Sequence, residues 1–156
     1  MLVLALLVLL QTAPAPPGED PVPPYAMSDA NAGGRPFKGV AMLEAFHGVA
    51  GTDRIVDDLV TTSQADPRIG DIFKGQDIVR LRRTLKEQFC LLLNGGCRYT
   101  GRDMAIAHKN LGIQAKDMNA LVENLQAAMR REGVAFSDQN AFLAKLAAMK
   151  PNVVTR

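Results

Sequence analysis

The chain has 156 residues, of which 47% are apolar and 22% charged, so it is long enough to fold as one domain around a hydrophobic core. Its net charge of +2 comes from interspersed positive and negative residues, which argues against a nucleic-acid partner, because such proteins cluster lysine and arginine. Alternating runs of β-branched residues are missing, whereas alanine, leucine, lysine and glutamine are abundant. The composition therefore predicts an all-α fold.

The N-terminal residues resemble a secretory leader. Residues 1–15 begin with an apolar run and end in Ala13-Pro14-Ala15, a small-residue pattern typical of cleavage sites. We predict a signal peptide or leader there, which implies export, for example to a periplasm. However, no lysine or arginine precedes Arg35, and a start at Met27 would leave the protein cytoplasmic.

A segment rich in proline and glycine follows the leader. Residues 16–36 bury too little apolar surface to fold by themselves, so we predict a linker. The folded domain is then expected over residues 37–156. No transmembrane segment is expected, because the leader's apolar run is shorter than the about 20 residues that cross a bilayer.

Within the domain, apolar residues recur at every third or fourth position, which predicts helices separated by glycine or proline. Helices are expected over residues 37–46, 52–64, 77–93, 115–132 and 137–150, with a helical turn at 66–73 and a short helix between residues 100 and 112. Thr52 and Ser137 are expected N-caps, and Thr100 with Asp103 fits a capping box. Pro151 is expected to end the last helix.

His108, one of only two histidines, lies on the short helix that Gly112 is expected to stop. Met104, His108 and Leu111 share one side of this helix, so the imidazole belongs to an apolar stripe. The preceding long helix carries a second apolar stripe, formed by Leu81, Leu85, Phe89 and Leu92. Apolar walls with one imidazole suit a haem, so we interpret His108 as an iron ligand. The alternative is a core histidine whose nitrogens bond to a carbonyl and a water.

Haem propionates require nearby cations, and the spacing leaves five basic candidates open: Arg82, Arg83, Lys86, Arg98 and Lys109. Cys90 and Cys97 are not part of a C-x-x-C-H motif, so covalent c-type haem attachment is excluded. Cys90 is expected to pack as a small apolar residue, although a disulfide with Cys97 is conceivable in an exported protein. A zinc site lacks enough ligands.

Five motifs occur in order along the chain: Asp66-Pro67-Arg68 through Phe73, Asn94-Gly95-Gly96, Tyr99-Thr100-Gly101-Arg102-Asp103-Met104, Ala107-His108 and Leu111-Gly112-Ile113. Together they resemble the truncated haemoglobins of group I over about residues 42–150. The resemblance implies a two-over-two helical sandwich, haem b and His108 as the proximal ligand. It further implies that Phe73 stacks on the porphyrin and that Phe89 matches a residue that gates a gas tunnel in some members. The remaining expected porphyrin contacts are Leu81, Leu85, Tyr99, Met104, Ile113, Met118 and Leu125.

The chain departs from this family on the expected distal side. Leu59-Val60 replaces the usual Phe-Tyr, so the tyrosine that donates a hydrogen bond to bound oxygen is absent. Leu85 stands where many members carry glutamine, and His47-Gly48 keeps half of a glycine pair. The expected distal pocket is therefore apolar, lined by Val60, Leu81, Leu85 and Phe89. Thr61, Thr84 or Gln88 could still supply a donor by helical spacing.

We therefore expect a haem b protein that binds a diatomic gas, namely oxygen, carbon monoxide or nitric oxide, for example in oxygen transport. The same iron could support nitric oxide dioxygenation, peroxide turnover or electron transfer. Such an enzyme would need an external reductase, because the chain has no flavin or nicotinamide motif. We expect a monomer or weak dimer. The alternative hypothesis is a haem-free helical interaction module on a globin frame.

Overall fold

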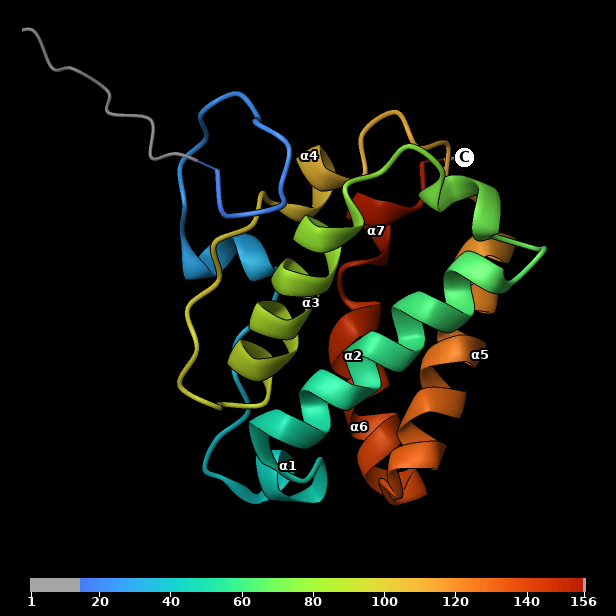
Figure 1. The fold of residues 1–156 in the computed structure, drawn as a ribbon. Helices are drawn as coiled ribbons and strands as arrows, with labels where there is room; N and C mark the ends of the chain where they lie inside the picture. The colour runs from blue at the N-terminus through green and yellow to red at the C-terminus, as the bar shows by residue number, and fades with distance from the viewer. Residues whose placement is uncertain (1–14, 156) are drawn as a thin grey trace, which may run out of the picture.

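The computed structural model describes residues 15–155, and every regular element in this range is a helix (Figure 1). With η marking a 3-10 helix, the elements are η1 (Asp29–Ala32), α1 (Ala41–Ala45), α2 (Gly48–Ala65), η2 (Gly70–Phe73), α3 (Ile78–Leu92), α4 (Met104–Ala107), α5 (Ala115–Glu132), α6 (Phe136–Ala147) and α7 (Lys150–Val153). Among these helices, none is both long and apolar enough to cross a membrane. The predicted all-α class is confirmed.

Two helix pairs form the body of the fold. α2 packs against α3 in one pair, and α5 packs against α6 in the other. α2 also lies along α5, which joins the two pairs (Figure 1). The short helix α4 rests on α7 near the C-terminus. This arrangement is the two-over-two helical sandwich predicted above.

Buried phenylalanine rings connect the two pairs. The ring of Phe142 on α6 meets the ring of Phe46, just before α2, at a centroid distance of 5.1 Å. It meets the ring of Phe89 on α3 at 4.9 Å, and both contacts are edge-to-face. Each ring is removed from water, which stabilises the fold by about 1.5–3 kcal/mol per side chain. Phe89 therefore points inward, as expected, and lies in the aromatic centre of the core.

Local sequence accounts for several helix ends. α5 has the predicted bounds, because Gln114 and Asp117 form a capping box at its start. Gly133 ends α5 with a left-handed φ of 86°, a conformation that glycine adopts without strain. At the start of α3, the Asp77 carboxylate accepts a hydrogen bond of 2.9 Å from the backbone N–H of Arg80.

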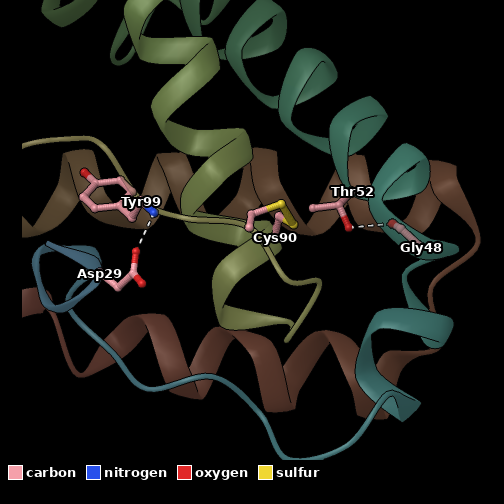
Figure 2. Close-up of a disulfide and its surroundings, with 6 residues drawn as sticks. Asp29, Gly48, Thr52, Cys90 and Tyr99 are labelled. Carbon is pink, nitrogen blue, oxygen red and sulfur yellow. Dashed lines mark hydrogen bonds between the residues drawn. A yellow bond between two sulfur atoms is a disulfide. The ribbon is translucent and has the colours of Figure 1, made fainter. Parts of the chain in front are cut away.

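Two predicted caps and one predicted stop are wrong. Thr52 lies inside α2, which begins at Gly48, and its hydroxyl donates a hydrogen bond of 2.9 Å to the Gly48 carbonyl (Figure 2). Ser137 lies in the first turn of α6, whose N-cap is Ala135. Pro151 does not end a helix but lies in the first turn of α7. Proline is tolerated there because the backbone N–H that it lacks would have no partner within the helix.

The proline-rich residues 16–36, predicted above as a linker, pack on the domain. Ala32 is fully buried, and the side chain of Glu19 is only 1% exposed. Polar contacts with α3 and with the loop after it supply what the segment lacks in apolar surface. The division of the chain at residue 36 stays a prediction. The predicted leader lies outside the described residues apart from Ala15.

Candidate haem-binding site

The loop between α3 and α4 leads directly to the histidine helix. Asp103 starts α4 by accepting a hydrogen bond of 2.9 Å from the N–H of Ile106. The predicted capping box with Thr100 is wrong, because the N–H and hydroxyl of Thr100 both donate to the Glu87 carboxylate on α3, each at 2.8 Å. The loop is thus tied to α3 before α4 begins.

His108 is the C-cap of α4, which ends sooner than the expected stop at Gly112. Its Nδ1 lies 2.7 Å from the carbonyl oxygen of Met104, one turn earlier. A carbonyl can only accept, so Nδ1 carries the proton of the neutral ring and Nε2 keeps a free lone pair. His108 therefore presents one nitrogen donor, held in the way that a metal-bound imidazole usually is.

Burial keeps this imidazole neutral near pH 7. Desolvation lowers the pKa of His108 from its ordinary value of 6.5, against the hydrogen bond with Met104, which raises it. A neutral ring is required, because a protonated imidazole cannot donate to a metal. Among the described residues, no three His, Cys, Asp or Glu side chains gather into a metal site, so iron at His108 would need its other ligands from a porphyrin. The residues present fit a haem.

Most of the predicted porphyrin contacts belong to one hydrophobic cluster. Its members from the prediction are Val60, Leu81, Leu85, Phe89, Tyr99, Met104, Ile113, Met118 and Leu125. Phe73 is half-buried at the end of η2 and lies outside this cluster in the described part of the chain. Tyr99 is buried, but its hydroxyl donates a hydrogen bond of 3.0 Å to the Arg102 carbonyl in its own loop. The roles of these residues toward a haem stay predictions.

The three side chains that could add a distal hydrogen-bond donor are all engaged elsewhere. Thr61 is exposed at the surface, and its hydroxyl accepts a hydrogen bond of 2.9 Å from Arg82. The Thr84 hydroxyl donates to helical carbonyls of α3, and the Gln88 amide donates to the Ala32 carbonyl at 2.8 Å. Val60 and its neighbour Leu59 are buried and apolar. The chain therefore offers little polarity on the expected distal side.

Most of the five candidate cations for the propionates already have acidic partners. The ion pairs are Arg82 and Lys86 with Asp57, Arg83 with Glu19 and Glu87, and Arg98 with Asp29. Lys109 follows His108, is exposed, and has no ion pair among the residues that the structure describes. It borders a surface hollow of about 540 Å³ between α4 and α7. Sequence reasoning missed Asp57, because no local pattern shows that it lies opposite two basic residues of α3.

Cys90 and Cys97 form a disulfide, with their Cα atoms 5.7 Å apart (Figure 2). This corrects the expectation that Cys90 only packs as an apolar residue, although it is also buried. Gly95 makes the bond compatible with the turn, because a Cβ atom there would lie 2.7 Å from the Cys90 sulfur. The disulfide borders a hollow of about 380 Å³ between α2 and α3.

Comparison with known proteins places this geometry in a family. The bacterial-like globin family model matches residues 41–155, so the chain belongs to the bacterial-like globins. A group 1 truncated haemoglobin of Tetrahymena thermophila is 35% identical over 75 residues, which are 48% of this chain and 60% of that protein. A group 1 truncated haemoglobin of a Nostoc species is 28% identical over 104 residues, 67% of this chain and 88% of that protein. The predicted family resemblance is confirmed.

Solved structures agree on the fold. The truncated haemoglobin of Tetrahymena pyriformis in its Fe(III) form has a TM-score of 0.70 at 23% identity and covers 74% of this chain and 98% of its own. The 2/2 haemoglobin of a Synechococcus species, in the cyanomet state with covalently attached haem, has a TM-score of 0.66 at 22% identity, with the same coverage. The two-over-two sandwich is therefore confirmed.

Proposed function

We propose that this protein binds haem b, with the iron held by Nε2 of His108, and that the other side of the iron takes a diatomic gas. The 2.7 Å contact between Nδ1 of His108 and the Met104 carbonyl carries the proposal, because it leaves Nε2 free to donate. When bound, haem supplies an iron that takes up oxygen, carbon monoxide or nitric oxide. Membership of the bacterial-like globins supports the proposal.

The chain's own residues would orient and shield the group. Leu81 and Leu85 on α3 join the hydrophobic cluster that also contains Met104, so they would exclude water from the porphyrin faces. Lys109 is next to His108 and is exposed, which suits it to a propionate. The pairing of Arg82 and Lys86 with Asp57 instead links α3 to α2.

Oxygen should be held weakly, because the buried Val60 side chain is apolar and the exposed Thr61 side chain brings no donor to the interior. A hydrogen bond to a charged partner contributes about 1.5–3 kcal/mol, so its absence should speed oxygen dissociation by roughly tenfold to a hundredfold. Carbon monoxide depends less on such a bond and should bind with less penalty.

The first test is the absorption spectrum of the haem-supplied protein, recorded ferric and then ferrous, with and without carbon monoxide. The protein should retain about one haem per chain, with a Soret band that carbon monoxide shifts. His108→Asn should lose or alter this spectrum, because it removes the proposed iron ligand.

The matched control is His47→Asn, the same change at the other histidine. His47 is exposed, pairs with Glu132 and has a left-handed φ of 59°, which asparagine tolerates. It should leave the spectrum unchanged. If the wild-type chain retains no haem, or if both variants behave alike, the proposal is wrong and the haem-free interaction module becomes the better account.

A further inference from the structure

Residues 16–34, here named the strap, run beside α3 and beside the loop that connects α3 to α4 (Figure 1). The family model begins only at residue 41, so the strap lies outside the part of the chain that matches other bacterial-like globins. Its contacts fall into three groups, which involve α3, the loop and the core beneath them.

The first group fastens the strap to α3. The side chain of Glu19 is 1% exposed, and its carboxylate accepts hydrogen bonds of 3.1 Å from Arg80 and 2.9 Å from Arg83. The backbone N–H of Asp20 also donates to the Asp77 carboxylate at 2.8 Å. A carboxylate this buried is held only because two guanidinium groups pair with it, so the contact is specific.

The second group fastens the strap to the loop. The Asp29 carboxylate accepts a hydrogen bond of 2.8 Å from the backbone N–H of Tyr99 (Figure 2). It also pairs with Arg98 at 2.8 Å. The hydroxyl of Tyr25 donates to the Thr100 carbonyl at 2.6 Å. These three contacts thus join the strap to the part of the loop that leads to Asp103 and α4.

The third group places the strap directly on the core. The Ala32 carbonyl accepts the Gln88 amide at 2.8 Å, and Gly33 lies so close to the core that an added Cβ atom would be 3.0 Å from Met104 Cγ. Met104 is the first residue of α4, and its backbone carbonyl holds the ring of His108. The strap therefore touches both α3 and Met104, the residue whose carbonyl orients the histidine.

We propose that the strap is a positioning element, which joins α3 to the loop before α4 and so sets where α4 holds His108. The strap acts as one unit, so releasing its Glu19 end also loosens its grip on Tyr99. The part that concerns haem rests on the proposed function above, whereas the coupling between Glu19 and Tyr99 does not.

Amide hydrogen exchange of the haem-free full chain tests the coupling. In Glu19→Ala, the backbone amide of Tyr99 should exchange about tenfold faster or more, the effect expected when charged hydrogen bonds are lost. The control is Glu123→Ala, which removes an exposed carboxylate of α5 that pairs with Arg68 and not with the strap. An unchanged Tyr99 amide in Glu19→Ala would overturn the proposal, since the ends would then act independently.

Two further measurements extend the test. Tyr25→Phe removes a single hydroxyl and should also speed exchange at Tyr99, which keeps the proposal testable if Glu19→Ala does not fold. In haem-loaded protein, the iron–histidine stretching band of the ferrous form should shift in Glu19→Ala and not in Glu123→Ala. If this band does not shift in Glu19→Ala, the strap does not position His108. If the chain retains no haem, the proposed function is wrong, and the exchange result still decides whether Glu19 and Tyr99 are coupled.

Discussion

Among single residues, Val60 has the most direct bearing on the proposed gas binding. It is 1% exposed and stands at the place where relatives carry a tyrosine, by the resemblance described above. The neighbouring Thr61 is exposed at the surface, beside Arg82, so its hydroxyl does not substitute for the missing phenol. The affinity for oxygen should therefore respond to this one side chain.

Val60→Tyr should slow oxygen dissociation by roughly tenfold to a hundredfold, because it restores a donor to the bound ligand. Stopped-flow displacement of oxygen by carbon monoxide measures the rate. Val60→Phe is the matched control, since it adds the same ring without the hydroxyl, and the larger ring itself should destabilise the fold by about 1–3 kcal/mol. Equal oxygen dissociation rates in the two variants would contradict the proposal that a missing hydrogen-bond donor at position 60 makes oxygen binding weak.

For the secondary-structure elements, the end of α3 and the loop after it are held by the Cys90–Cys97 disulfide. Closing this short loop should stabilise the fold by about 2–3 kcal/mol, chiefly by restricting the unfolded chain. Disulfides persist mainly in oxidising compartments, so the pairing favours the expectation of export.

A reductant should accordingly lower the free energy of unfolding of the wild-type chain by about 2–3 kcal/mol. Urea unfolding with and without a reductant measures the difference. The double variant Cys90→Ala, Cys97→Ala should show no response to the reductant. Two free thiols in protein isolated from its natural source would contradict the pairing and with it the argument for export.

For the whole molecule, stability should fall in two stages as the pH is lowered. Burial lowers the pKa of His108 from 6.5, so the unfolded chain binds a proton first and unfolding is favoured below about pH 6.5. Hydrogen bonds from Arg83, opposed by desolvation and aided by Arg80, hold the pKa of Glu19 below its ordinary 4.5. The stability from Glu19 is thus present above pH 4.5 and is lost below it.

Urea unfolding of the haem-free chain at a series of pH values tests both stages. His108→Asn should remove the stage between about pH 7 and pH 5, and Glu19→Gln should reduce the stage below about pH 4.5. The Glu123→Gln variant serves as the control for the second stage. A wild-type free energy of unfolding that is constant from about pH 7 to pH 5 would show that His108 is not buried as a neutral ring.

The helices were predictable to the extent that their signals are local. Helix α5 begins and ends where the sequence predicted, because its signals act within a few residues. These signals are the capping box of Gln114 and Asp117 and the left-handed Gly133. Thr52 misled the prediction, because a threonine inside a helix can bond back to a carbonyl one turn earlier. Part of the site was equally readable, since Met104 and His108 are one turn apart.

By itself, the sequence determined the all-α class, the order of the long helices and the single histidine on an apolar stripe, because these depend on periodicity and on motifs read over short stretches. Only the tertiary structure decided that Cys90 bonds to Cys97, that Asp57 joins two cations of α3, and that the strap packs on the domain. Glu19 shows the physical reason: its partner Arg83 is 64 positions away, and no local pattern reports which distant charges will be buried together.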